Sequence, residues 1–186
     1  MNKYIVLEHI KFEDWKLASQ LLHSKQFLFS FDLKSGYHHI DIHPDFQSFL
    51  GFSWQVGGVT KFYYFTVLPF GLASAGHIFT KVVRCLVKHW RALSIPIIVY
   101  LDDGLGISES FEEASANALR VRADLIRSGF VINSKKSNWS PVTSLTWLGV
   151  DIDSDLGLFA YLRERLSQFA LCFFLYCLLG ELRLAL

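Results

Sequence analysis

The sequence predicts an α+β domain in which helices pack on one face of an antiparallel sheet. Three observations lead to this fold class. The 186 residues are 52% hydrophobic and 16% aromatic, enough for one globular core. Stretches with helical spacing alternate with short β-prone runs joined by tight turns, which is typical of helices layered on antiparallel strands. Two acids, Asp102 and Asp103, follow the apolar run Ile97–Leu101 and precede Gly104, which indicates a hairpin.

The first half of the chain is predicted to form one helix and three strands. Apolar residues recur at helical spacing from Phe12 or Glu13 to about His23. Phe27–Leu33 is aromatic-rich and β-prone, and it places Asp32 at the end of a strand. Val56-Gly57-Gly58-Val59 is a hairpin turn signal. The strands that flank this turn are expected at Phe49–Trp54 and Lys61–Val67.

The second half is predicted to form two long helices around the acidic hairpin. Leu68-Pro69-Phe70-Gly71 ends the preceding strand, and a helix follows from an N-cap at Ser74 to about Trp90. Ser110 and Glu113 form a capping box for the second helix. The remaining expected boundaries are the end of this helix near Ser128, strands Ile97–Leu101 and Leu105–Ser108 with the turn Asp102-Asp103-Gly104, and short strands near Phe130–Ile132 and Leu145–Ile152.

Residues 1–168 are interpreted as one unit, and residues 169–186 as an apolar C-terminal tail. The uncharged stretch Phe169–Leu179 is shorter than the roughly 20 residues that span a bilayer. It therefore predicts a buried or truncated helix and no membrane role. The N-terminus lacks an apolar run of signal-peptide length, and the three cysteines lack metal-binding spacing. We therefore expect an intracellular protein, cytoplasmic or nuclear.

Three carboxylates can converge if the strand that ends at Asp32 lies beside the hairpin of Asp102 and Asp103. Adjacent ionised carboxylates repel one another and are costly to desolvate, and a divalent cation relieves both penalties. Oxygen ligands suit Mg²⁺ or Mn²⁺, and two such ions stabilise the attacking and leaving oxygens in phosphoryl transfer. From these residues alone, a solvated acidic turn is the alternative. The His and Asp side chains of residues 38–43 lack a fourth ligand nearby and are not expected to bind metal.

Five segments carry a family resemblance: FSFDLKSGYHHIDI, LPFGLASAGHIFTKV, YLDDG, GFVINSKKS and LTWLGVDID. They resemble motifs A to E of reverse transcriptases, in that order and with suitable spacing, over about Phe12 to Asp153. The likeness is greatest to polymerases of retrotransposons of the DIRS-like and Ty3/gypsy-like kinds. The resemblance implies a polymerase palm with partial fingers and without a complete thumb.

The resemblance also implies catalytic roles. Asp32 and Asp102 would hold two Mg²⁺ or Mn²⁺ ions, with Asp103 as a supporting metal-binding carboxylate. Lys136 matches a lysine proposed to protonate pyrophosphate as a general acid, and an exposed cation beside Lys135 is the alternative. The expected reaction is RNA-directed DNA synthesis, which transfers a nucleotide from dNTP to a primer.

Substrate and primer contacts are implied in the same way. Tyr37 matches an aromatic gate that collides with a ribose 2′-hydroxyl, and a core aromatic is the alternative. Phe70 and Gly71 would lie under the incoming nucleotide and the template base, with Tyr100 also substrate-binding. A simple break between strand and helix is the alternative for Phe70 and Gly71. Trp147-Leu148-Gly149 resembles the primer-grip hairpin, and a packed β-hairpin is the alternative.

The ends of the chain depart from the family pattern. Only residues 1–31 precede Asp32, so the basic fingers residues that grip a triphosphate are missing, and thumb and RNase H segments are expected elsewhere in a longer polyprotein. A net charge of +1 fits this picture, because gripping phosphates needs several Lys and Arg contacts. We hypothesise a palm-centred fragment of a retrotransposon polymerase, inactive alone, whose partners are a primed RNA or DNA template and dNTP. The alternatives are a non-catalytic, domesticated module that binds nucleic acid or protein, and an RNA-dependent RNA polymerase, which is expected to carry GDD instead of YLDD.

Overall fold

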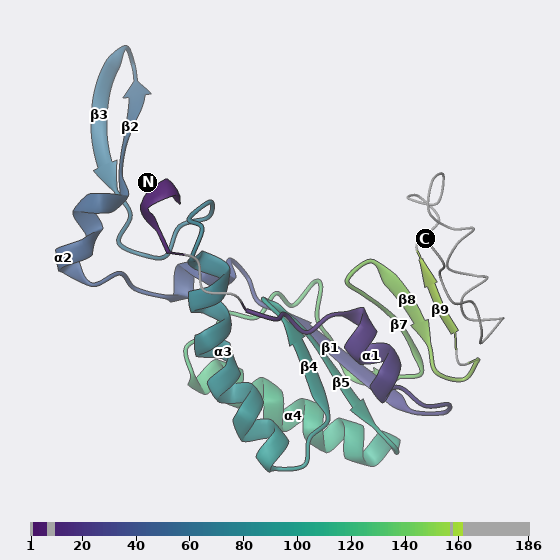
Figure 1. The fold of residues 1–186 in the computed structure, drawn as a ribbon. Helices are drawn as coiled ribbons and strands as arrows, with labels where there is room; N and C mark the ends of the chain where they lie inside the picture. Colours follow the sequence, from purple (N-terminus) through teal and green to yellow (C-terminus); the bar gives the residue numbers. More distant parts are fainter. Residues whose placement is uncertain (1, 7–9, 157, 162–186) are drawn as a thin grey trace.

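The structure, a computed structural model, describes residues 2–6, 10–156 and 158–161. Its centre is a four-stranded antiparallel sheet with the strand order β4-β5-β1-β6 (Figure 1). These strands are β1 Phe27–Asp32, β4 Ile97–Tyr100, β5 Asp103–Ser108 and β6 Asn138–Val142. The α-helices are α1 Trp15–Leu21, α2 Pro44–Gln47, α3 Ala75–Ala92 and α4 Phe111–Arg127. The other elements are η1 Asn2–Tyr4, η2 Gly36–His39, η3 Ser48–Leu50, β2 Gly51–Val56, β3 Val59–Tyr64, β7 Ser144–Trp147, β8 Val150–Asp153 and β9 Leu158–Tyr161.

Helices α3 and α4 pack on one face of the central sheet, as the sequence predicts (Figure 1). Each helix turns one apolar stripe inward, because apolar residues three and four positions apart lie on the same side of a helix. The buried residues of this layer include Phe29, Phe31, Ile97 and Val99 from the strands, Phe79, Val83 and Trp90 from α3, and Ala118, Val121 and Leu125 from α4. The indole N–H of Trp90 donates to the Asp124 carboxylate at 3.2 Å, so this buried polar group is satisfied.

The opposite face of the sheet is covered by α1 and the β7–β8 hairpin. Ala18 of α1, Trp147 of β7 and Ile152 of β8 share a buried cluster with Leu28 and Leu105 of the sheet. Both faces of β1 are therefore buried, which explains why FLFSFD is mainly apolar instead of alternating between apolar and polar residues. The sequence predicts only the first of these two covered faces.

The β2–β3 hairpin projects from this body, and every residue of its two strands is exposed (Figure 1). The loop residues Gly57 and Gly58 have φ angles of 58° and 80°, as a type I′ turn requires. The turn predicted from this glycine pair is therefore confirmed. β3 ends at Tyr64, before the predicted limit at Val67, and Val67 forms an isolated bridge with Asp41 instead.

The first helix is shorter than predicted at both ends. It begins at Trp15 because the Asp14 side chain accepts hydrogen bonds from backbone N–H groups of the first turn and caps the helix. It ends at Leu21, and the next residue, Leu22, is already extended. Periodicity alone cannot locate such ends, because a capping acid and a helical acid look alike in a sequence.

The predicted strand Phe130–Ile132 is wrong. Ile132 forms only an isolated bridge with Leu33, and the fourth strand of the central sheet is β6. β6 contains Pro141, which weakens a strand signal but is tolerated at the edge of a sheet. The stretch Leu145–Ile152 is not one run but the two paired strands β7 and β8.

The tail predicted at residues 169–186, with its helix, lies outside the described residues. The boundary at residue 168 lies outside them as well. Among the residues that the structure does describe, no helix has the length and apolar character needed to cross a membrane.

Candidate active site

The antiparallel register of β1 and β5 brings two acids opposite each other. Asp32 is the last residue of β1, and its cross-strand partner is Asp103, the first residue of β5. Directly opposed side chains in such a pair have Cβ atoms about 4.5–5.5 Å apart. Asp102 precedes Asp103 in the hairpin turn, and its carbonyl accepts a hydrogen bond from the N–H of Leu33 at 2.9 Å. The structure thus brings together the three acids that the sequence singles out.

The hairpin turn consists of Leu101 and Asp102, so the predicted turn Asp102-Asp103-Gly104 is wrong. Tyr100 pairs with Asp103, which leaves two residues in the loop. Leu101 has a φ angle of 54°, at the position where a type II′ turn normally carries glycine. A leucine in this conformation is strained and persists only where its surroundings fix it.

Gly104 serves packing and not the turn. A Cβ atom added at Gly104 would lie 2.2 Å from the ring of Phe31, and one added at Gly106 would lie 2.1 Å from the ring of Phe29. Each glycine is the cross-strand partner of that phenylalanine. The two rings stack against Trp139, with centroids 5.8 Å away for Phe31 and 6.2 Å away for Phe29. The glycine after the two acids therefore gives β1 room to pack over β5.

The loop before β6 holds the end of β1. The N–H of Asp32 donates to Ser137 Oγ at 3.1 Å, and the Asp32 carbonyl accepts from the N–H of Asn133 at 2.9 Å. Ser137 Oγ donates to the Asn133 carbonyl at 2.8 Å. Lys136 of the same loop places Nζ 3.4 Å from Asp32 Oδ2. Sequence reasoning selects Lys136 but misses Asn133 and Ser137, whose only signal is the turn-forming composition of this loop.

Burial and neighbouring carboxylates raise the pKa values of Asp102 and Asp103. Burial is the largest cause that raises the pKa of Asp103 to about 6, followed by the charges of Asp102 and Asp32 and a hydrogen bond with Asp32. Burial is also the main cause that raises the pKa of Asp102, although a backbone hydrogen bond and the charge of Lys136 oppose it. Like charges held in this way favour either a shared proton or a cation.

The donor chemistry of this cluster fits a divalent ion. Carboxylate oxygens are the ligands that Mg²⁺ and Mn²⁺ prefer. A cation would offset the burial and mutual repulsion that raise the pKa values of Asp102 and Asp103. Among the described residues, no three His, Cys, Asp or Glu side chains are already grouped as metal ligands. Asp32, Asp102 and Asp103 are the residues that could hold the ion once their side chains turn toward it.

Tyr37, in η2, lies beside the acids. Its ring centroid is 5.0 Å from that of Phe70 and 5.3 Å from that of Phe79. Burial, followed by the charge of Asp102, raises the pKa of Tyr37, so the phenol stays neutral. Gly36 permits this approach, since a Cβ atom there would lie 2.9 Å from Phe79 Cζ and 3.2 Å from Asp102 Cβ. The half-buried Tyr37 ring therefore joins the core to the acidic cluster.

Phe70 and Gly71 lie in the segment between β3 and α3. Phe70 is 64% exposed, as a ring available to a ligand would be. Gly71 has a φ angle of 83°, which favours glycine, and its carbonyl accepts a hydrogen bond from Asn2 Nδ2 at 2.8 Å. Tyr100 differs, because it packs on the sheet face covered by α1, with its ring centroid 5.7 Å from that of Phe12.

Trp147-Leu148-Gly149 forms the tip of the β7–β8 hairpin. Leu148 and Gly149 have φ angles of 50° and 75°, as a type I′ loop requires. Trp147 is 3% exposed and packs against the sheet. Its ring is therefore a core side chain, the alternative that the sequence leaves open, while the backbone of the loop stays a predicted primer contact.

The His39 ring connects two segments of the chain through its nitrogens. Its Nε2 accepts a hydrogen bond from the N–H of Val131 at 3.0 Å, and its Nδ1 lies 3.0 Å from the carbonyl oxygen of Gly36. Both ring nitrogens thus have partners in the protein.

Comparison with known proteins gives the family. Residues 6–152 match the family described as “Reverse transcriptase (RNA-dependent DNA polymerase)”. The chain belongs to the reverse transcriptase family. This reverse transcriptase domain is 30% identical over 123 residues to the “Putative enzymatic polyprotein” of Cassava vein mosaic virus, covering 66% of this chain and 18% of that protein. It is 28% identical over 134 residues to the “Retrovirus-related Pol polyprotein from transposon opus” of Drosophila melanogaster, covering 72% of this chain and 13% of that protein.

Solved structures of reverse transcriptases share the fold. The domain matches a foamy viral protease–reverse transcriptase in complex with double-stranded DNA, with a TM-score of 0.71 and 26% identity over 82% of this chain and 25% of that one. It also matches the foamy viral protein in complex with an RNA/DNA hybrid, with a TM-score of 0.71 and 25% identity over 88% of this chain and 21% of that one. The α+β palm fold predicted from the sequence is therefore confirmed. The reverse transcriptase domain spans less than a fifth of the polyproteins named above.

Proposed function

We propose that this domain catalyses RNA-directed DNA synthesis as the palm of a longer retrotransposon polyprotein of the DIRS-like or Ty3/gypsy-like kind. The observation that carries the proposal is the cross-strand pair Asp32 and Asp103 with Asp102 in the adjoining turn. The family supplies the reaction class, and the FDLKSGYHH segment supports the retrotransposon assignment.

Asp32, Asp102 and Asp103 would hold two divalent ions, Mg²⁺ or Mn²⁺. When bound, such ions lower the pKa of the primer 3′-hydroxyl and neutralise the triphosphate and the leaving pyrophosphate. The three carboxylates come from a strand end and a tight hairpin, and both are fixed by backbone hydrogen bonds. Rigid placement of this kind suits a site that must orient two reacting oxygens.

Lys136 and Tyr37 are assigned to the substrate. Lys136, whose side chain is 69% exposed, lies near Asp32 and can turn toward pyrophosphate as a general acid. Tyr37 packs on Phe70 and Phe79 beside Asp102, so its ring is held where it would meet a ribose 2′-hydroxyl. The exposed Phe70 and the adjacent Gly71 are assigned to the incoming nucleotide and template base.

The partners are a primed RNA or DNA template and dNTP. The Leu148-Gly149 loop is assigned to the primer end, through its backbone. We assign residues 1–168 to the palm with remnant fingers, and the other fingers, thumb and RNase H functions to further segments of the polyprotein. We infer that the isolated domain extends primers poorly, because gripping phosphates needs several Lys and Arg contacts.

Primer extension on an RNA template with Mg²⁺ or Mn²⁺ tests the proposal, with wild type compared to Asp102→Asn. Binding of Mn²⁺ alone provides a second readout that needs no template, primer or dNTP. Wild type should bind Mn²⁺, and Asp102→Asn should weaken that binding and abolish any extension. Equal Mn²⁺ binding and equal extension by the two proteins would refute the catalytic assignment and favour a non-catalytic binding module.

The gate is tested separately with Tyr37→Ala and Tyr37→Phe. Removing the ring should relax the preference for dNTP over rNTP, whereas phenylalanine keeps the ring and should keep the preference. A Tyr37→Ala protein that selects dNTP as strictly as wild type would refute the gate.

A further inference from the structure

β4 is an edge strand of the central sheet, and it leads directly into the turn that carries Asp102. Tyr100 pairs with Asp103 to close the hairpin, so hydrogen-bonded pairs alternate back along β4. The N–H of Val99 and the carbonyl of Ile97 therefore point away from β5. Unpaired groups on a sheet edge need partners, and the partners here come from outside the sheet.

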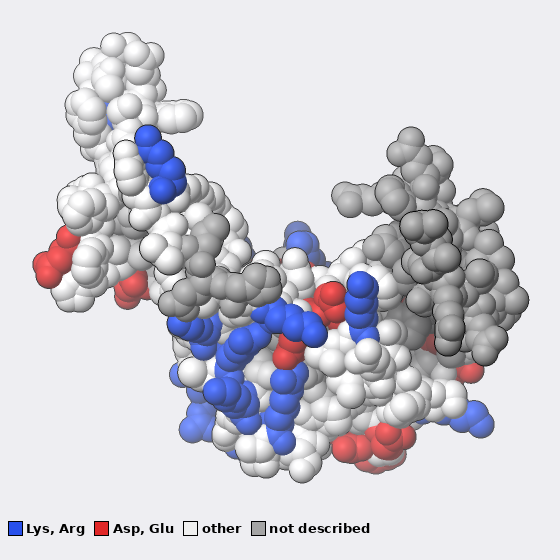
Figure 2. Space-filling view, in the orientation of Figure 1, with Lys and Arg blue, Asp and Glu red and all other residues white. Residues whose placement is uncertain are grey.

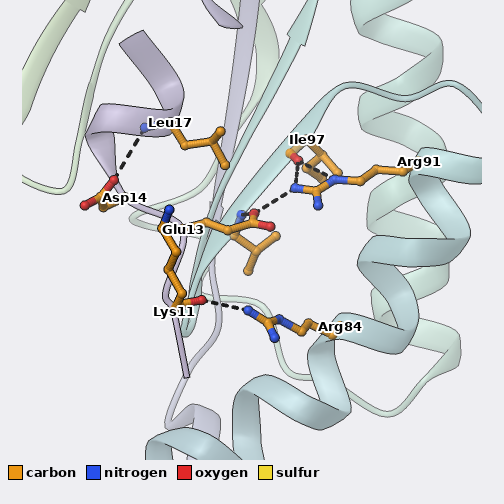
Figure 3. Close-up of polar contacts among 8 residues, drawn as sticks. Lys11, Glu13, Asp14, Leu17, Arg84, Arg91 and Ile97 are labelled. Atoms are coloured by element: carbon orange, nitrogen blue, oxygen red, sulfur yellow. Dashed lines mark hydrogen bonds and ion pairs between the residues drawn. The ribbon is translucent and has the colours of Figure 1, made fainter. Parts of the chain in front are cut away.

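Glu13 and Arg91 supply these partners (Figure 3). Glu13 Oε2 accepts a hydrogen bond from the N–H of Val99 at 3.0 Å and lies 2.8 Å from Arg91 Nη2. Arg91 donates to the carbonyl of Ile97 from Nη2 at 2.8 Å and from Nε at 3.3 Å. The Glu13 side chain is only 17% exposed. The two side chains thus act on β4 as a neighbouring strand would.

The segment that carries Glu13 is fastened on either side. Figure 2 shows Lys and Arg side chains gathered over α3, and Arg84 from this helix donates to the carbonyl of Lys11 at 2.7 Å. On the other side, the backbone carbonyl of Asp14 accepts hydrogen bonds from the N–H groups of Leu17 and Ala18 at the start of α1. Glu13 is therefore held from both directions, which lowers the entropy lost when it bonds to β4.

Contacts at the end of β4 extend this support into the turn. The ring of Phe12 lies 5.7 Å from that of Tyr100. Leu101, with its strained φ angle of 54°, lines the same small cavity as Glu13 and Val99. The turn is tied to β1 through the hydrogen bond from Leu33 N–H to the Asp102 carbonyl. A shift of β4 would therefore move the turn and its acid.

We propose that Glu13 is a positioning residue for the acidic turn: by holding the free edge of β4 it fixes Asp102 opposite β1. This inference rests on the proposed function, because positioning Asp102 affects catalysis only if Asp102 binds the catalytic metal ions. If Glu13 had only a structural role, it would stabilise the domain without fixing the position of the turn. Its loss would then leave exchange at Leu33 and Mn²⁺ binding as they are in a variant of equal stability.

The test compares Glu13→Ala, Glu13→Gln and the neighbouring Asp14→Ala in the full chain. Asp14→Ala removes an acid of the same segment that caps α1 and does not contact β4, so it controls for loss of stability. The first readout is amide hydrogen exchange without metal. Glu13→Ala should speed exchange at Val99 and also at Leu33, whereas Glu13→Gln keeps an acceptor for Val99 and should protect both amides. Asp14→Ala should leave both near wild type.

The second readout is Mn²⁺ binding. Glu13→Ala should weaken binding by roughly 10-fold to 100-fold, as loss of a residue that orients metal ligands does, and Asp14→Ala should leave it within about twofold. Faster exchange at Val99 alone, with Mn²⁺ binding equal to that of Asp14→Ala, would overturn the proposal and leave Glu13 as an edge cap. Glu13→Gln behaving like Glu13→Ala would overturn the role of the acceptor.

If Glu13→Ala does not fold, Arg91→Lys is measured in the same way. Lysine keeps the charge but cannot bridge Glu13 and the Ile97 carbonyl as arginine does, and the same faster exchange at Leu33 is expected. The proposed function fails in a different manner, since wild type and Asp102→Asn would then bind Mn²⁺ equally. The exchange at Leu33 still decides whether Glu13 positions the turn.

Discussion

Replacing Gly104 by alanine should unfold the hairpin that carries the acids. The new Cβ atom would lie 2.2 Å from ring carbons of Phe31, whereas carbon atoms in contact lie about 3.5–4.0 Å apart. Strand and ring must therefore part by roughly 1.3 Å. The Phe31 ring cannot retreat, because it is 1% exposed, stacks on Trp139 at 5.8 Å and meets Trp90 edge-on at 6.2 Å.

Overpacking of a core costs about 1–3 kcal/mol and more where nothing can yield, so we expect a loss of about 3 kcal/mol or more for Gly104→Ala. Urea unfolding followed by tryptophan fluorescence measures this change. The control is Gly51→Ala, another strand glycine, whose added Cβ would have its nearest neighbour at 3.5 Å and should change stability by about 0.5 kcal/mol or less. A second arm adds Phe31→Leu to Gly104→Ala, which should recover part of the loss. Equal stability of the two alanine variants, or a double variant whose losses simply add, would refute this reasoning.

Three further predictions concern the surroundings of the acids. Because burial raises the pKa of Asp103 from 3.8 to about 6, the folded state binds a proton more tightly in this interval, and the free energy of unfolding should fall as pH rises through it without divalent ions. Asp103→Asn should reduce this slope and leave only the part due to Asp102, whose pKa burial also raises, and an unchanged slope would count against the assignment. Ser137→Ala should cost about 1–3 kcal/mol in urea unfolding because it leaves the N–H at the end of β1 without its acceptor, while the exposed Ser140→Ala should have little effect; equal losses would contradict this role. Lys136→Met should raise the pKa values of Asp102 and Asp103 in an NMR titration, since the Lys136 charge lowers both; unchanged titrations would show that Lys136 does not act on the acids.

Local patterns in the sequence predict much of the fold. The Gly57-Gly58 turn, α3 and α4 are found where spacing and capping residues place them. These features depend on residues within a few positions of one another, so a single sequence carries their signal. The strand at Phe130–Ile132 is wrong for the opposite reason, because pairing with β1 selected β6 instead.

The candidate site likewise contains residues that local motifs reveal and residues that only long-range contacts reveal. Asp32, Asp102, Asp103, Tyr37 and Lys136 are recognisable from their motifs, and the structure places them near one another. Their supporting residues were invisible, because they act through contacts between distant segments: Ser137 reaches Asp32 across 105 positions and Glu13 reaches Val99 across 86. No local spacing encodes such a contact.

The sequence by itself determined the family, because the family depends on residue types in short motifs, and the same motifs contain the acids on which the proposed chemistry rests. Only the tertiary structure decided which residues form the turn, why glycine follows the acids, and that Trp147 is a core residue. Each of these answers depends on what another strand or helix places against the residue. The register of β1 and β5 puts Asp103 opposite Asp32 and Gly104 under Phe31, and that register is a property of the folded sheet.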